Sequence, residues 1–275
     1  MTWHRLGRTV DARMPLRELR AAFARTDIVA LDLDQCIFPG YTQSELSWRV
    51  AKRLVRRPER PGDRRLLARL GARGAWLGLR ELKRLLGLAT PMRRLAARYE
   101  RAMAGIPEHY VRAAAAEIPA ASFPFAAETV AELGSRAPTG LVTLGLDVVA
   151  QAYLEQFTGP AGPSLSFFDA NVVVFRRQQD GRVFHRYDPE AFLEHGEDKR
   201  RALERRMGAR GAMVPTTVGH SADDLPLARL SRERGGVAIG FNPAPALAQA
   251  FDVVVRGRDW EPMYALVAAL GSGWP

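Results

Sequence analysis

The sequence predicts an α/β protein with a three-layer, Rossmann-like core around a parallel sheet, plus an inserted all-helical cap domain. Short apolar runs alternate with helical patterns along most of the chain, which is typical of βαβ units. Residues 41–125 are the exception, because they show no convincing strand and carry helical stretches interrupted by prolines. We therefore assign residues 1–40 and 126–275 to the core and residues 41–125 to the helical cap.

The expected strands are apolar on both faces, as in a buried parallel sheet. A short amphipathic helix over residues 15–26 precedes them, with Leu16, Leu19 and Phe23 on one face. Helical patterns separate most of the runs that follow. The expected strands cover residues 28–33, 140–144, 213–218, 237–241 and 252–255, and the expected helices cover residues 126–135, 147–157, 198–207 and 225–234.

One further segment predicts a β-hairpin. The segments 172–175 and 182–185 flank the sequence Gln-Gln-Asp-Gly, and Asp180-Gly181 is a strong signal for a tight hairpin turn. This hairpin interrupts the alternation of strands and helices in the second half of the chain.

Composition favours a soluble, cytoplasmic protein without a membrane anchor. The chain has 275 residues, of which 47% are hydrophobic and 25% charged. It contains no run approaching the ~20 apolar residues that a membrane span needs, and residues 1–10 lack the apolar core of a secretory signal. Cys36 is the single cysteine, so an internal disulfide is impossible.

The net charge of +10 raises the question of a nucleic-acid partner. Only three of the 40 basic residues are lysines, so a general bias toward arginine explains much of the excess. The excess is also local, because residues 41–125 hold 18 basic and 7 acidic residues. We therefore do not expect a nucleic-acid partner, and we keep a protein that acts on or binds nucleic-acid ends as the last-ranked alternative.

Polar side chains follow the expected strands, where the carboxyl ends of a parallel sheet place ligands. A carboxylate can attack phosphorus and form an acyl-phosphate, a second acid can transfer protons, and acids can hold a hard cation such as Mg²⁺. Lys199 is notable because an arginine-rich chain keeps a compact ammonium there, which fits between a carboxylate and a phosphate. The residues in question are Asp32, Asp34, Thr143, Lys199, His220, Asp223 and Asp224.

These motifs resemble the haloacid dehalogenase superfamily, specifically its phosphatases with a helical cap, over nearly the whole chain from about residue 28. The resemblance implies that Asp32 is the nucleophile and Asp34 the general acid/base. It implies that Thr143 binds a phosphoryl oxygen, that Lys199 is the third-motif lysine and that Asp224 is the later acid of the fourth motif. The hairpin at Asp180-Gly181 and the stretch 238–245 are similar to the phosphoserine phosphatase subgroup.

The chain departs from the family pattern at His220, where the resemblance implies an acid that binds Mg²⁺. Histidine is a poor ligand for Mg²⁺, so Asp223 could substitute, or the site could prefer Mn²⁺ or Zn²⁺. His220 is interpreted either as a metal ligand or as a loop histidine beside the site, and Asp223 either as a ligand or as a helix cap. The metal set that we consider comprises Asp32, Asp34, His220, Asp223 and Asp224.

The function that we expect is metal-assisted hydrolysis of a small phosphomonoester through an aspartyl-phosphate on Asp32. The cap would close over the site and set specificity, and its basic character predicts a substrate with a further negative charge. The alternative, motivated by His220, is a catalytically impaired family member that binds a phosphorylated ligand or a protein partner.

Overall fold

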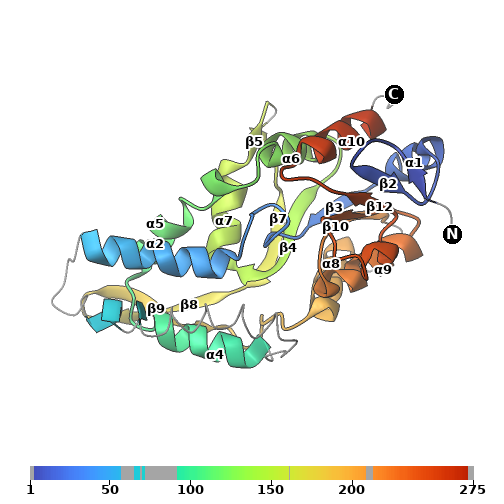
Figure 1. Cartoon of the computed structure of the whole chain (residues 1–275). Helices are drawn as coiled ribbons and strands as arrows, with labels where there is room; N and C mark the ends of the chain where they lie inside the picture. The colour runs from blue at the N-terminus through green and yellow to red at the C-terminus, as the bar shows by residue number, and fades with distance from the viewer. Residues whose placement is uncertain are drawn as a thin grey trace.

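An eight-stranded sheet runs through the centre of the computed structural model, with helices on both of its faces (Figure 1). Six neighbouring strands are parallel, and two short antiparallel strands from the N-terminus extend one edge. In order across the sheet, the strands are β1 (His4–Arg5), β2 (Val10–Ala12), β12 (Val253–Val255), β11 (Ala238–Phe241), β10 (Pro215–Gly219), β3 (Ile28–Leu31), β4 (Thr139–Leu146) and β7 (Phe167–Asn171).

The structure describes most of the chain. The described ranges are residues 3–56, 65–68, 70–71, 92–160, 162–208 and 213–271. None of the helices within these ranges is long and apolar enough to cross a membrane.

The helices form two layers because successive strand residues point to opposite faces. In β3, Val29 and Leu31 join the larger apolar cluster, whereas Ile28 and Ala30 join the smaller one on the other face. The larger cluster is covered by α1 (Leu16–Phe23), α6 (Ala126–Gly134), α7 (Asp147–Gln156) and α10 (Glu261–Gly271), and the smaller one by α8 (Gly196–Met207) and α9 (Leu225–Glu233).

A separate group of elements extends from the sheet toward the left of Figure 1. Three helices come from the segment expected to be the cap, and a β-hairpin from the second half of the chain packs against two of them, α4 and α5. The group comprises α2 (Thr42–Arg56), α4 (Met92–Met103), α5 (Glu108–Ala115), β8 (Val173–Gln178) and β9 (Gly181–Tyr187).

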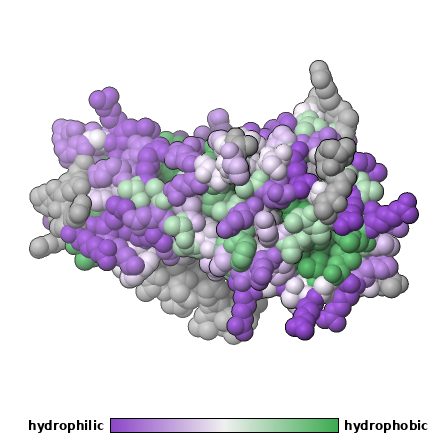
Figure 2. Space-filling model, turned by 90° about the horizontal axis from the view of Figure 1, so that it is seen from above, coloured by the Kyte–Doolittle hydropathy of each residue, from purple (hydrophilic) through white to green (hydrophobic). Residues whose placement is uncertain are grey.

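Short elements complete the described chain. They are the 3-10 turns η1 (Pro119–Ala121), η2 (Ala222–Asp224) and η3 (Ala248–Ala250), and a small hairpin of β5 (Thr158–Gly159) and β6 (Gly162–Pro163). Figure 2 shows hydrophilic side chains over most of the face seen from above, with apolar side chains gathered toward the end of the molecule where α10 lies.

The predicted three-layer α/β architecture is confirmed. All five expected strands and all five expected helices form within a few residues of their expected limits, and so does the hairpin. Three features were not expected, namely the antiparallel edge strands β1 and β2, the additional parallel strand β7, and the C-terminal helix α10.

Trp260 ties the start of α10 to the loop that follows β3. Its side chain is fully buried, and its indole N–H donates to the carbonyl oxygen of Cys36 at 2.7 Å. Three backbone N–H groups of the same loop, from Cys36, Ile37 and Phe38, donate to the carbonyl oxygen of Leu33. The loop is therefore held both by its own backbone hydrogen bonds and by the hydrogen bond from Trp260.

We predict that Trp260→Phe lowers the free energy of unfolding by about 1–3 kcal/mol, because it leaves the buried carbonyl of Cys36 without its donor. Trp48→Phe is the matched control, since Trp48 is 56% exposed and should change stability by less than about 0.5 kcal/mol. Urea unfolding of both variants gives the comparison. Equal midpoints for the two variants would contradict the assigned role of Trp260.

Candidate active site

Asp32 stands where β3 ends, at the carboxyl edge of the parallel sheet. Its backbone N–H donates to the carbonyl oxygen of Val218 in the neighbouring strand β10 at 2.9 Å, so Asp32 is held in the sheet ladder. β10 then ends at Gly219, where an added Cβ would lie 2.4 Å from the Cβ of Asp224. Glycine at this position therefore lets Asp224 approach the end of the strand closely.

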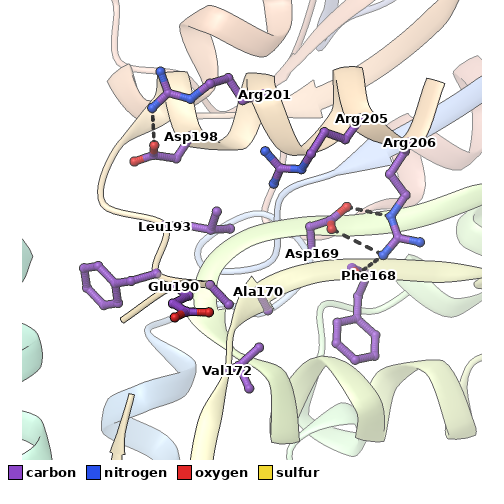
Figure 3. A pocket seen from close by; sticks show the side chains of 12 residues that line it. Phe168, Asp169, Ala170, Val172, Glu190, Leu193, Asp198, Arg201, Arg205 and Arg206 are labelled. Carbon is purple, nitrogen blue, oxygen red and sulfur yellow. Dashed lines mark hydrogen bonds and ion pairs between the residues drawn. The ribbon is translucent and has the colours of Figure 1, made fainter. Parts of the chain in front are cut away.

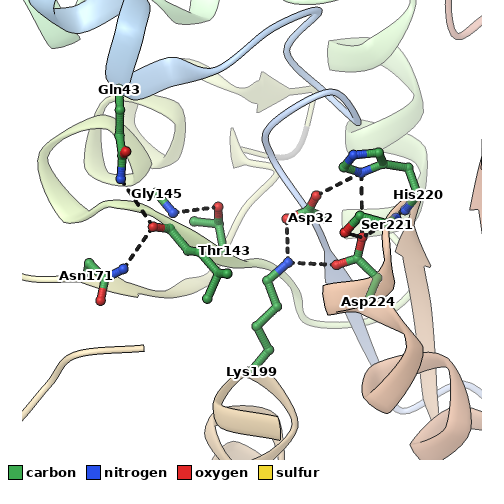
Figure 4. Close-up of polar contacts among 10 residues, drawn as sticks. Asp32, Gln43, Thr143, Gly145, Asn171, Lys199, His220, Ser221 and Asp224 are labelled. Carbon is green, nitrogen blue, oxygen red and sulfur yellow. Dashed lines mark hydrogen bonds and ion pairs between the residues drawn. The ribbon is translucent and has the colours of Figure 1, made fainter. Parts of the chain in front are cut away.

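Lys199 lies between these two carboxylates (Figure 4). Its Nζ is 2.6 Å from Asp32 Oδ1 and 2.7 Å from Asp224 Oδ1, and the lysine side chain is 2% exposed. Burial lowers the pKa of Lys199, but the charges of Asp224 and Asp32 outweigh burial and raise the pKa above its usual range. The ammonium group is thus positively charged and fixed between two acids.

The second oxygen of Asp224 closes the loop after β10. Asp224 Oδ2 accepts hydrogen bonds from the N–H groups of His220 and Ser221 and from Ser221 Oγ, each at 2.9 Å. Burial raises the pKa of Asp224, but the nearby charge of Lys199 and these hydrogen bonds lower it below its ordinary value. Asp224 is therefore held as a carboxylate.

His220 brings an imidazole nitrogen to the same cluster. Its Nδ1 lies 3.2 Å from Asp32 Oδ2 and 3.5 Å from Asp224 Oδ2. The nitrogen is buried but makes no hydrogen bond of good geometry with any described residue. Burial lowers the pKa of His220, yet the carboxylates of Asp32 and Asp224 outweigh it and raise the pKa.

Asp34 lies two residues beyond Asp32 and is held by the start of α2. Its Oδ1 accepts a hydrogen bond from the backbone N–H of Thr42 at 2.7 Å. Burial raises the pKa of Asp34 to about 6, against the smaller lowering effect of the hydrogen bonds from Thr42. A carboxyl group with this pKa can both donate and accept a proton near neutral pH.

Thr143 and Asn171 organise the end of β4. Thr143 is buried, and its Oγ1 accepts a hydrogen bond from the N–H of Gly145 at 3.0 Å. The Asn171 amide donates to the carbonyl oxygens of Leu144 and Leu193 at 2.8 and 3.2 Å, and its Oδ1 accepts from the Leu193 N–H. Asn171 thus links the end of β4 to the segment that leads into α8.

These residues surround a cavity of about 540 Å³ at the carboxyl edge of the sheet. Asp32, Asp34, Thr143, Lys199, His220 and Asp223 all line it, and Asp224 lies buried behind Lys199. Sequence reasoning missed Tyr41 and Gln43, which also line the cavity and carry no signal beyond their position at the start of a helix, whereas Asn242 belongs to the stretch 238–245 already singled out. Of the 18 basic residues in the segment 41–125 that suggested an anionic substrate, eight lie outside the described residues.

Three of the five considered metal ligands form one cluster within the described chain. One ligand atom each from Asp32, His220 and Asp224 lies within 4.8 Å of the other two, whereas Asp34 and Asp223 line the cavity outside this cluster. Two ligands at neighbouring positions around an ion with bonds of ~2.1 Å lie about 3 Å apart. The two carboxylates and the Nδ1 of a neutral His220 therefore offer oxygen and nitrogen ligands together, and Mn²⁺ and Zn²⁺ accept nitrogen more readily than Mg²⁺ does.

Comparisons with known proteins identify the family and the fold. A model of the haloacid dehalogenase-like hydrolases matches residues 29–229. A phosphoserine phosphatase structure in the apo form is 18% identical, with a TM-score of 0.58 over 87% of this chain and 98% of that chain.

Two further solved structures share the fold. A structure of cytosolic 5'-nucleotidase IIIB bound to cytidine is 16% identical, with a TM-score of 0.64 over 97% of this chain and 94% of that chain. A protein of unknown function from Bordetella pertussis Tohama I is 21% identical, with a TM-score of 0.59 over 84% and 98% of the two chains. A search of curated protein sequences finds no significant match.

We predict that Lys199→Met lowers the free energy of unfolding by about 3–5 kcal/mol, because it leaves two buried carboxylates without their cation. Lys52→Met is the matched control, since Lys52 is exposed on α2 and should cost less than about 1 kcal/mol. Chemical denaturation in metal-free buffer measures both. A cost for Lys199→Met no larger than that of the control would contradict the assigned charge balance.

Proposed function

This chain belongs to the haloacid dehalogenase-like hydrolase family, and from that premise we propose that it hydrolyses a small phosphomonoester through a phosphoryl group carried on Asp32. The observation that carries the proposal is the ammonium of Lys199, fixed within 2.7 Å of both Asp32 and Asp224 at the edge of a cavity. Such a cluster offers a nucleophilic carboxylate beside a fixed positive charge, as phosphoryl transfer requires.

The residues support a two-step reaction. In the first step, an Asp32 carboxylate oxygen attacks phosphorus, the bond from phosphorus to the ester oxygen breaks, and Asp34 gives its proton to the departing alcohol. In the second step, Asp34 takes a proton from water, the water oxygen attacks phosphorus, and the bond to Asp32 breaks to release inorganic phosphate. The pKa of about 6 at Asp34 suits both proton transfers.

The other residues act on the phosphoryl oxygens. Lys199 offsets their negative charge, and the Thr143 hydroxyl, held by the Gly145 N–H, is proposed to donate to one of them. Asp32, His220 and Asp224 would hold a divalent cation, which when bound also offsets the phosphoryl charge. Asp34 and Asp223 would support this site from the cavity wall without belonging to the three-residue cluster.

The segment 41–125 is proposed to act as the cap that sets specificity. Within it, α2 begins at Thr42, whose N–H holds Asp34, so the position of this helix and the proton-transfer group are linked. We propose that closure excludes bulk water from the cavity and that the substrate carries a further negative charge. We also propose that the protein is located in the cytoplasm.

We predict that the protein hydrolyses an aryl phosphate with a divalent cation and that Asp32→Asn lowers kcat at least a thousandfold, because the amide cannot act as the nucleophile. Asp180→Asn is the matched control, because Asp180 is exposed in the hairpin turn and does not line the cavity, and it should retain activity within twofold. Release of phosphate, measured with each metal in turn, provides the test.

Two outcomes of this assay would contradict the proposal. Unchanged turnover in Asp32→Asn would exclude Asp32 as the nucleophile. Absent turnover with every metal and a panel of natural phosphomonoesters, together with retained phosphate binding, would instead establish the impaired binder.

We predict that the protein binds Mn²⁺ at least tenfold more tightly than Mg²⁺ and that His220→Asp reverses this preference, because a carboxylate replaces the imidazole nitrogen. Titration calorimetry on the metal-free protein measures both affinities without relying on activity. His185→Asp, at an exposed position in β9, controls for the added charge. An equal preference in the wild type and His220→Asp would contradict a metal-ligand role for His220.

A further inference from the structure

A second cavity, of about 370 Å³, lies against α8 (Figure 3), and its lining residues differ from those of the catalytic cavity. Its walls are α8, β7 and the segment 190–193, and none of the proposed catalytic residues lines it. Its volume falls within the range of small-molecule sites, about 300–1,000 Å³. The cavity is thus large enough for a metabolite and separate from the proposed chemistry.

Most of the charges at this cavity are already paired. Arg206 bonds to both carboxylate oxygens of Asp169, at 2.8 and 3.3 Å, and Arg201 forms an ion pair with Asp198. These contacts, drawn in Figure 3, hold two of the three arginines on this face of α8. Each ion pair is neutral as a whole, so these four side chains add no net charge to the cavity.

Two charged side chains at the cavity have no such partner. Arg205 lies one turn of α8 beyond Arg201, and Glu190 lies on the opposite wall in the segment that leads back to α8. Neither the guanidinium of Arg205 nor the carboxylate of Glu190 makes an ion pair or hydrogen bond within the described chain. The cavity therefore presents one available cation and one available anion.

Apolar side chains also line this cavity. Phe168, Val172 and Phe192 are partly buried at the cavity wall, and Leu193 is buried behind them. An apolar surface of this kind stabilises a ligand by removing its carbon atoms from water. The lining thus combines apolar side chains with charges of both signs, which is the complement of a small zwitterion with an apolar body.

We propose that this cavity is a binding site for a small zwitterion of the free apolar amino-acid class, with the ligand carboxylate on Arg205 and the ligand ammonium at Glu190. Guanidinium binds carboxylate in a planar, two-point geometry, and these charge-assisted bonds are stronger than neutral ones. Nothing in the proposed hydrolysis uses either residue.

Both walls of the cavity are also connected to residues that line the catalytic cavity. Lys199 and Arg205 stand on the same helix, and Asp198, which caps that helix through the N–H groups of Glu194 and His195, is part of the cavity wall. On the other wall, Asn171 ties Leu193 to Leu144, which lines the catalytic cavity. A bound zwitterion would therefore act on the two elements that position Lys199 and the end of β4.

Titration calorimetry with three probes that carry the same isobutyl group tests the proposal. L-leucine carries both charges, isocaproate carries only the acid and isoamylamine only the base. We expect the wild-type protein to bind L-leucine most tightly, and Arg205→Gln and Glu190→Gln each to weaken L-leucine binding about tenfold or more. Of the two probes with a single charge, Arg205→Gln should weaken the binding of isocaproate only. Glu190→Gln should weaken the binding of isoamylamine only.

Arg177→Gln is the matched control, because Arg177 is exposed on the hairpin and does not line the cavity. It should leave the affinity for all three probes unchanged. No binding of L-leucine to the wild type at millimolar concentration, or an equal loss in the control, would overturn the proposal. These measurements need no turnover, so their failure is distinct from failure of the proposed hydrolysis.

Discussion

The arrangement of the site depends on one buried ammonium group shared by two carboxylates. An isolated charge in this position would carry a large desolvation cost, so Lys199, Asp32 and Asp224 can be buried only together. They come from α8, the end of β3 and the turn after β10, and their pairing therefore fixes how these elements meet. Glycines permit the close approach, since an added Cβ at Gly196 would lie 2.4 Å from the carbonyl oxygen of Asp223.

Much of this arrangement could be predicted from the sequence because it follows from local patterns. Apolar runs of strand length identified five strands of the sheet, and the rule that ligands lie at carboxyl strand ends brought Asp32, Thr143 and Asp224 to one edge. The retention of lysine at position 199 in an arginine-rich chain was also informative, because the site accepts a compact ammonium.

Other features could not be predicted because they depend on tertiary contacts. The strand β7 is mixed in character, Phe-Phe-Asp-Ala-Asn, and Arg206 of α8 pairs with its aspartate. The edge strands β1 and β2 are two and three residues long, too short for a periodic signal. Asn171 shows no motif, and its role emerges only from the three hydrogen bonds that join Leu144 to Leu193. Likewise, sequence alone could not choose among the five possible metal ligands. In the structure, Asp32, His220 and Asp224 lie together in one cluster, and Asp34 and Asp223 lie outside it.

The most direct test of the central claim is detection of the phosphoryl group on Asp32 itself. The protein would be mixed with a turned-over phosphomonoester, quenched in acid within milliseconds and digested, and the mass of the peptide containing Asp32 would be measured. The account predicts that this peptide gains the mass of one phosphoryl group during turnover and loses it once the substrate is exhausted. Continued turnover with no such gain on this peptide would mean that water attacks the substrate directly, and Asp32 would not be the nucleophile.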